Sequence, residues 1–298
     1  MSKYYYFSWD AGWGDTIWHL TNALIHCENS KQDMLIDLRG HWSSKGEKNL
    51  FNEYFCSIDT DINIITNEES IDQLKKDSEK HTNKTVKIKN PLKSKEDTVL
   101  FYNTFSRIKP SESVTNTVKD IVREKFKGNY MVGVHARMSN GEVKSRFEGA
   151  RPMKDAVLFY KEKIDDILFN APRAFLKSCK DYKFFIASDS SKFVDIFKDQ
   201  FPNTISIDRY FAPPGCGTGH EIGEGSTEEQ LKLEEVYGKT KIAKEALVDF
   251  YLLQETNFLF KNFSRFNEFC VYKGMPNFHI NFQDYFHLPL NQCLDLIK

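Results

Sequence analysis

The order of apolar runs constrains this fold most. Short runs that read as buried β-strands alternate with longer stretches whose apolar residues recur at helical spacing. The predicted strands are 4–8, 34–38, 61–65, 99–102, 131–135, 183–187, 204–207 and 257–260. The predicted helices cover 17–27, 114–126, 156–169, 191–201 and 241–254. This alternation predicts an α/β fold with parallel sheets, in which ligands bind at the carboxyl ends of the strands.

The chain has 298 residues, enough for two domains of ordinary size. A connecting helix is expected at 114–126, with Pro110 just before it as a start signal. We therefore predict an N-terminal domain over residues 1–115 and a C-terminal domain over 116–298. A glycine-rich insertion spans 213–239, and it is either a tolerated surface insertion or a lid over bound substrate.

Composition excludes several classes of protein. The hydrophobic content is 40%, the charged content 28% and the formal net charge −1, which give no reason to expect a nucleic-acid partner. The N-terminus lacks the apolar segment of a signal peptide, and no run of eighteen apolar residues predicts a membrane span. Six scattered cysteines without a CxxC pair predict buried, reduced thiols. We expect a cytoplasmic protein without an integral membrane segment.

The stretch YMVGVHARMSNGE, residues 130–142, ends a predicted strand with His135, Arg137 and Glu142. A guanidinium presents paired donors and keeps its charge, so Arg137 past a strand end suits a phosphate or carboxylate ligand. His135, on the same face, would reach the same ligand. A structural ion pair is the alternative explanation for Arg137.

Asp249 lies beside the apolar stripe of the predicted helix 241–254. It has no Lys or Arg three or four positions away on either side, so its carboxylate needs donors from elsewhere or exposure to water. Guanine offers two adjacent N–H donors. Backbone amides of a neighbouring loop are the alternative partner for Asp249.

Three further stretches suit helix N-termini. Asp189 follows a strand within SDSS and is well explained as a helix cap. Ser264 precedes Arg265 before an apolar stretch, where backbone N–H groups would receive a phosphate or simply be capped. The loop 9–15 contains Gly12, Gly14 and Asp15, and either Asp15 or Thr16 is expected to cap the helix that follows.

Four strings in order, VGVHARMSNGE, FFIASDSSKFVDIF, KEALVDFYLL and FKNFSRF, resemble the motifs shared by the α1,6- and peptide O-fucosyltransferases. With GWGDTIWHLTNAL and LIDLRGHW, the chain is most similar to the bacterial nodulation (chitin-oligosaccharide) α1,6-fucosyltransferases, most weakly between about 55 and 125. The family pattern carries a second basic residue after the arginine, where this chain has Met138, and its loop is shorter than 213–239.

The resemblance implies a GT-B glycosyltransferase with two Rossmann-like domains facing a cleft. It implies transfer of fucose from GDP-β-L-fucose to a glycan hydroxyl with inversion and without a metal. Arg137 would hold the β-phosphate, while His135 and Asp249 would contact guanine. Ser264 would bind phosphate, the Gly12–Asp15 loop would close over the donor, and Asp189 and Arg265 complete the predicted donor-binding set.

In that reaction a carboxylate takes the proton of the attacking hydroxyl, and Glu142 is the first choice, with Glu148 second. Glu142 also fits a solvated loop residue. A metal-dependent transferase using Asp59 and Asp61 of a D-x-D string is one rival, and a transferase of another nucleotide sugar is a second. A third is a sugar-binding protein that keeps the fold without catalysis.

The sequence names neither the acceptor nor the oligomeric state. Four aromatic residues of the first half either stack on sugar rings or pack in the core, and they are Trp13, Trp18, Trp42 and Tyr54.

Overall fold

The protein forms two compact units in a computed structural model. The structure describes residues 3–41, 43–44, 46, 48–88, 94–136, 182–189, 191–211, 238–261, 265–269 and 278–281. The first unit comprises Met1–Val118 with Lys239–Leu247, and the second comprises Lys119–Gly238 with Val248–Lys298. Helix α10 (Lys239–Gln254) therefore begins in the first unit and ends in the second. The two domains as we bounded them stay a prediction.

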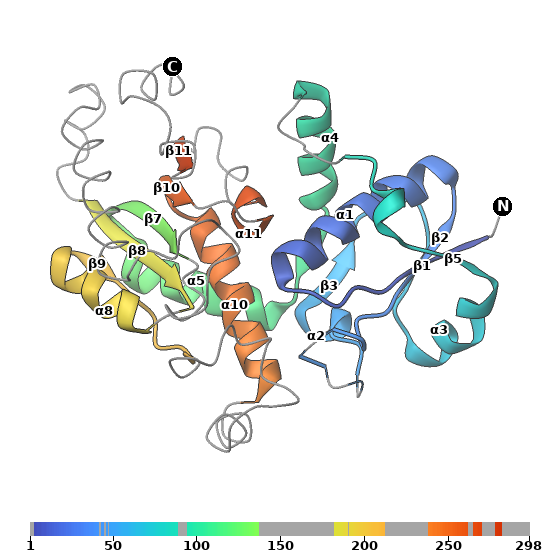
Figure 1. Ribbon diagram of the computed structural model, residues 1–298, viewed down its shortest axis with the longest axis horizontal. Helices are drawn as coiled ribbons and strands as arrows, with labels where there is room; N and C mark the ends of the chain where they lie inside the picture. Colours follow the sequence, from blue (N-terminus) through green and yellow to red (C-terminus); the bar gives the residue numbers. More distant parts are fainter. Residues whose placement is uncertain are drawn as a thin grey trace. The chain divides into compact units, whose positions relative to one another are not determined.

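The first unit is built on a parallel sheet in the order β4-β2-β1-β5, of which β2, β1 and β5 are labelled in Figure 1. Its strands are β1 (Tyr4–Phe7), β2 (Asp33–Ile36), β4 (Ile64–Ile65) and β5 (Ser78–Lys80). Helix α1 (Trp13–Ser30) packs on β1 and β2 and against α4 (Lys95–Phe105). The side chains of Tyr5, Phe7, Ile17 and Leu20 are fully buried in this core.

Smaller elements complete the first unit. Strands β3 (Phe55–Ile58) and β6 (Ile108–Pro110) pair antiparallel and follow α2 (Phe51–Tyr54) and α4 respectively. Helix α3 (Glu68–Leu74) leads into the 3-10 turn η1 (Lys75–Asp77), and a second such turn is η2 (Asn83–Thr85). Helix α5 (Glu112–Ile121) passes from the first unit into the second after Val118, and it continues in the second unit as one π-helical turn, η3 (Val122–Phe126).

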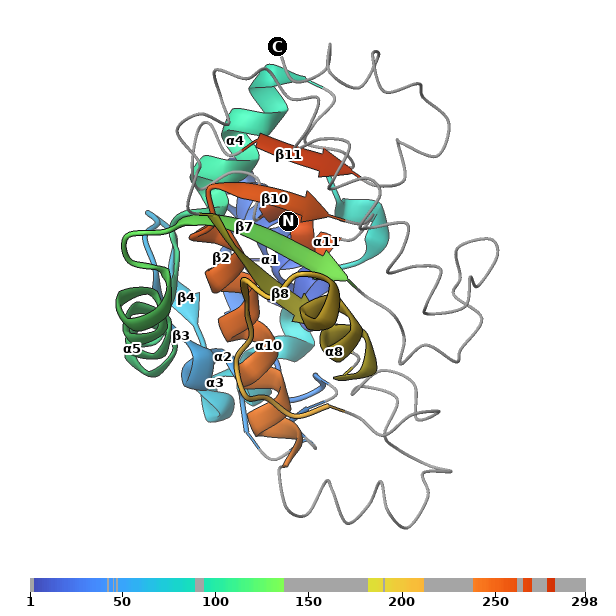
Figure 2. The ribbon, with the colours of Figure 1, turned by 90° about the vertical axis from the view of Figure 1, so that its left-hand side faces the viewer.

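The second unit holds a parallel sheet in the order β11-β10-β7-β8-β9, and Figure 2 labels its strands β11, β10, β7 and β8. Its strands are β7 (Tyr130–Ala136), β8 (Tyr182–Ser188), β9 (Thr204–Ile205), β10 (Phe258–Lys261) and β11 (Phe278–Asn281). Helix α8 (Ser191–Gln200) packs against β8, and α11 (Arg265–Glu268) follows β10. Strands β7 and β8 pair in register from Tyr130↔Tyr182 to Ala136↔Ser188. Both strands therefore end together at one edge of the sheet.

The α/β prediction is confirmed, but several local predictions were wrong. Residues 99–102 lie inside helix α4 instead of forming a strand, because only Phe101 of that run is buried while Val99 and Leu100 are exposed. Helix α1 begins at Trp13 with Gly12 as its N-cap, so neither Asp15 nor Thr16 caps it. The helix expected at 114–126 does form with Pro110 just before it, but it begins at Glu112 instead of Val114, and Pro110 itself ends strand β6.

Other predictions lie wholly or partly outside the described residues. These are the helix at 156–169 and almost all of the glycine-rich insertion at 213–239. Of the two cysteines that the described ranges place, Cys27 is buried and Cys56 is exposed, so the prediction of buried thiols was wrong for Cys56. No helix within the described ranges is both long and apolar enough to cross a membrane.

Gly133 in the middle of β7 is required by a close approach of the turn before β10. A Cβ atom at this position would lie 2.7 Å from Oγ1 of Thr256 and 3.0 Å from Cδ1 of Leu259. Thr256 is buried, and its hydroxyl donates to the carbonyl of Leu253 at the end of α10. Glycine at position 133 therefore lets the end of α10 and the start of β10 pack tightly on β7.

We expect the substitution Gly133→Ala to lower the free energy of unfolding by about 1–3 kcal/mol, because the added methyl group overpacks this contact. Urea denaturation followed by circular dichroism measures the change. The matched control is Gly40→Ala, whose Cβ would meet Oγ of Ser8 at an ordinary 3.5 Å. Equal midpoints for the two variants would contradict the packing role of Gly133.

Candidate functional site

His135 lies at the carboxyl end of β7 and is almost fully buried, with 9% of its surface exposed. Its ring stacks on Phe266 of α11, with ring centroids 4.9 Å apart and an interplanar angle of 21°. Phe266 in turn packs edge-on against Phe250 of α10 at 5.3 Å. These contacts bring the end of β7, helix α11 and the second half of α10 together.

Asp249 lies next to Phe250 on α10, and its partner is Arg209. The carboxylate Oδ2 pairs with Nη1 of the guanidinium, and the two side chains are only 13% and 6% exposed. Arg209 also donates from Nη2 to the carbonyl of Ile186 in β8 at 3.2 Å and from Nε to the carbonyl of Ile207 at 3.4 Å. The hydrogen-bond donor that Asp249 needs is therefore Arg209. The two partners considered from the sequence were guanine and the backbone amides of a neighbouring loop.

Asp249 and His135 belong to one neighbourhood near the carboxyl ends of β7 and β8. Arg209, which holds Asp249, donates to Ile186, and Ile186 is the register partner of Val134, the residue before His135. The aromatic contacts through Phe266 link His135 to Phe250, the residue that follows Asp249 on α10. The structure therefore gathers an imidazole, a carboxylate and a guanidinium where ligands of parallel sheets bind.

Two more predicted residues lie beside this neighbourhood. Asp189 directly follows β8, whose last residue Ser188 pairs with Ala136, the last residue of β7. Arg265 is the first residue of α11 and is exposed, next to the Phe266 that stacks on His135. The predicted residues Arg137, Glu142 and Ser264, together with Met138 and Glu148, lie outside the described residues.

The remaining predicted donor residues are in the first unit. Gly12 caps α1, and Gly14 and Asp15 lie in its first turn, so the expected loop over 12–15 was wrong: only Gly12 is outside the helix. The helix starts early because Trp13 is buried and its indole Nε1 donates to the carbonyl of Ala243 in α10 at 2.8 Å. A contribution of these three residues to donor binding stays a prediction.

A buried cluster of histidines supports the segment before α1. The ring of Trp9 stacks on His19 at 3.6 Å, and Nδ1 of His19 lies 3.1 Å from Nε2 of His81. Nδ1 of His81 is 2.7 Å from the hydroxyl of Tyr5. Burial, followed by the nearby His19 and His26, lowers the pKa of His81 to about 3. His81 is therefore neutral across the physiological range.

The aromatic candidates for sugar stacking are core residues. Trp13, Trp18 and Tyr54 are all at most 3% exposed, and Trp42 lies outside the described residues. The hydroxyl of Tyr54 donates to the carbonyl of Thr240, and Trp18 packs on Phe101. Buried rings offer no face to a sugar, so core packing explains these three.

The D-x-D string follows strand β3. Between its two aspartates, Thr60 donates to Oε1 of Glu28 at 2.6 Å, and Glu28 forms a bidentate ion pair with Arg107. Arg107 also donates to the backbone carbonyl of Asp59 at 3.3 Å. Among the residues that the structure describes, no group of three or more His, Cys, Asp or Glu side chains could hold a metal ion.

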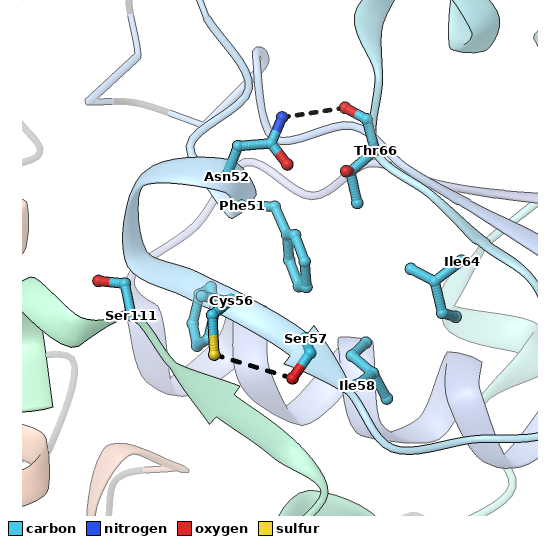
Figure 3. A pocket seen from close by; sticks show the side chains of 9 residues that line it. Phe51, Asn52, Cys56, Ser57, Ile58, Ile64, Thr66 and Ser111 are labelled. Atoms are coloured by element: carbon cyan, nitrogen blue, oxygen red, sulfur yellow. Dashed lines mark hydrogen bonds between the residues drawn. The ribbon is translucent and has the colours of Figure 1, made fainter.

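A pocket of about 450 Å³ lies in the first unit between α2, β3 and the end of β4 (Figure 3). Its lining residues are Phe51, Asn52, Phe55, Cys56, Ser57, Ile58, Ile64, Thr66 and Ser111. The amide of Asn52 donates to the carbonyl of Thr66 at 3.1 Å, and the ring of Phe51 points into the pocket. The lining contains no Lys, Arg or His, so it offers no charge to compensate a diphosphate.

Sequence reasoning missed Arg209 and Phe266. The signal for Arg209 was present in the sequence. Asp249 lies beside an apolar stripe without an intrahelical partner, so it needs a cation from elsewhere. Arg209 comes just after the predicted strand at 204–207. Phe266 gave no such signal, because an aromatic residue in a short helix is usually core.

Comparisons with known proteins agree with this fold. The family model "Nodulation protein Z (NodZ)" matches residues 52–275. The solved structure of fucosyltransferase NodZ from Bradyrhizobium is 14% identical, with 91% of this chain and 92% of that chain covered and a TM-score of 0.60. NodZ α-1,6-fucosyltransferase soaked with GDP-fucose is 15% identical, with 91% and 92% covered and a TM-score of 0.59. No curated protein sequence matches. The fold is therefore of the GT-B type.

The buried His81 predicts a specific pH dependence. Its pKa is lowered from 6.5 to about 3 on folding, so the unfolded chain binds one more proton between these pH values and stability is lost as the pH falls. We expect the unfolding free energy of the wild type to fall more steeply than that of His81→Gln, by about 1.4 kcal/mol per pH unit between pH 6 and 4. Urea titrations at pH 4, 5, 6 and 7 measure both slopes, and parallel slopes would contradict a neutral His81.

Proposed function

The chain belongs to the nodulation protein Z family, and on that premise we propose that it is a glycosyltransferase that moves fucose from GDP-β-L-fucose to a hydroxyl of a glycan acceptor. The observation that carries the proposal is the family match over residues 52–275, which includes the predicted positions from His135 to Arg265. The likeness to a NodZ enzyme soaked with GDP-fucose, over 91% of the chain, supports the choice of donor.

The second unit is the proposed donor-binding half. His135 and Asp249 face the guanine, Arg137 holds the β-phosphate and Ser264 binds phosphate, while Asp189 and Arg265 complete the proposed donor-binding set. The clustering of His135 and Asp249 near the carboxyl ends of β7 and β8 supports this assignment. Gly12, Gly14 and Asp15 are proposed to contact the donor from the start of α1.

The proposed reaction is a single displacement. The acceptor oxygen forms a bond to the anomeric carbon while the bond from that carbon to the β-phosphate oxygen breaks, and GDP leaves with the electron pair. The anomeric centre inverts, and Glu142 takes the proton of the attacking hydroxyl. Charge develops on the departing phosphate, which the Arg137 guanidinium stabilises, so the proposal requires no metal. We further propose that the enzyme works in the cytoplasm.

A donor screen tests the proposal directly. Thermal shifts with GDP, UDP, ADP and dTDP identify the nucleotide, and release of GDP from GDP-fucose and from GDP-mannose identifies the sugar. We expect GDP alone to raise the melting temperature and GDP-fucose to turn over equally with and without EDTA. A preference for another nucleotide or sugar would replace the donor, loss of turnover with EDTA would favour the D-x-D rival, and binding without turnover would favour a sugar-binding protein.

Arg137→Ala should lower fucosyl transfer at least a hundredfold, because a single charge-compensating group in a transition state is worth about 3–4 kcal/mol. Transfer is measured as GDP release with acceptor present, and the melting temperature controls for folding. Arg123→Ala, an exposed arginine of the same unit, is the matched control. A fully active Arg137→Ala enzyme would remove Arg137 from the mechanism.

Glu142→Gln should keep GDP affinity while turnover falls about a hundredfold to ten-thousandfold, since the amide cannot accept the proton. Calorimetry with GDP and initial rates with GDP-fucose separate binding from chemistry. Unchanged turnover would move the base to another carboxylate, and Glu148→Gln is the variant to examine next.

A further inference from the structure

We propose that Arg209 is a positioning residue for nucleotide recognition: it holds the Asp249 carboxylate, ionised and oriented, to accept the N1–H and the 2-amino group of guanine. The inference rests on the proposed function, because it assigns how the donor-binding half selects its base. In this proposal Arg209 does not touch the base itself and acts on it through the side chain of Asp249.

The first argument is burial. Asp249 and Arg209 are 13% and 6% exposed, so neither charge is well solvated, and each would be costly without the other. Helix α10 supplies no cation to Asp249, since the residues three and four positions away are Glu245, Ala246, Leu252 and Leu253. Arg209 therefore provides the charge that allows a carboxylate to stay ionised at this depth.

The second argument is the anchoring of Arg209. Strand β9 pairs only with Phe184 and Phe185 of β8, so it stops short of Ile186. The chain beyond β9 brings Arg209 back to this strand, where Nη2 donates to the Ile186 carbonyl at 3.2 Å while Nη1 pairs with Asp249. The planar guanidinium is thereby fixed on a sheet strand and on a helix at once, which fixes the direction of the carboxylate.

The third argument is chemical fit. A carboxylate offers about four lone-pair sites, so one ion pair through Oδ2 leaves acceptors for two further N–H donors. Guanine presents two such adjacent donors, whereas hypoxanthine presents one and adenine lacks the N1–H. A protonated Asp249 would instead present a hydroxyl donor to the base. Keeping Asp249 ionised therefore favours guanine over both other purines.

Calorimetry with GDP and IDP tests the inference on the intact protein, since IDP differs from GDP only by the 2-amino group. We expect the wild type to bind GDP about tenfold to a hundredfold more tightly than IDP, the value of one hydrogen bond to a charged group. In Arg209→Gln this ratio should fall below about threefold while the IDP affinity stays within about threefold of the wild type. Arg209→Lys, which keeps the charge and loses the fork, should give an intermediate ratio.

Coupling provides the second readout. Arg209→Gln combined with Asp249→Asn should show the same GDP to IDP ratio as Asp249→Asn alone, because both changes remove one recognition unit. Arg123→Gln, an exposed arginine in the same unit, should leave both affinities unchanged. If Arg209→Gln does not fold, the ratio of GDP to IDP affinity is compared between Arg209→Lys and the wild type instead.

Three results would overturn the inference. A wild-type ratio retained in Arg209→Gln, or in Arg209→Lys if that is the variant that folds, would show that Arg209 does not position Asp249. Equal losses for GDP and IDP would show a purely structural ion pair. A wild type that turns over GDP-fucose without preferring GDP to IDP would reject base reading by Asp249 and leave the proposed function intact, whereas absence of GDP binding would reject the proposed function itself.

Discussion

The parallel ladder between β7 and β8 is the constraint on which the candidate site depends. Seven register pairs, from Tyr130↔Tyr182 to Ala136↔Ser188, bring the two strands to an end at the same level. Val134 and Ile186 are partners in this ladder. His135, which follows Val134, therefore lies near Arg209, which donates to the carbonyl of Ile186. Gly133 lets the segment that joins α10 to β10 pack on the same ladder, because a Cβ atom there would collide with Thr256.

The sequence predicted the buried parallel strands well because they are continuous apolar runs, as at Met131–His135 and Lys183–Ala187. It failed where periodicity was ambiguous. Residues 99–102 are four apolar residues in a row, yet the cap at Ser94, whose hydroxyl accepts from the N–H of Asp97, and the acids of the first turn signal the helix that forms. Strand β5 was missed because Ser78–Lys80 carries no apolar residue.

Of the candidate site, sequence reasoning reached the residues but not their pairing. The need of Asp249 for a donor followed from its helix alone, whereas the identity of that donor depends on a long-range contact with the segment after β9. Propensity and spacing carry no information about such contacts. A buried ion pair also contributes little net stability, because desolvation offsets attraction, so its presence favours a role in recognition over one in folding.

The Arg209–Asp249 pair has a consequence for how this protein can diverge. Either residue changed alone leaves a lone charge below the surface, whereas both changed together to apolar or neutral residues cost little. Positions 209 and 249 should therefore change together among homologues. Under the proposed recognition of guanine by Asp249, a homologue that lacks both residues would no longer select guanine, so the pair would mark homologues that use a different donor.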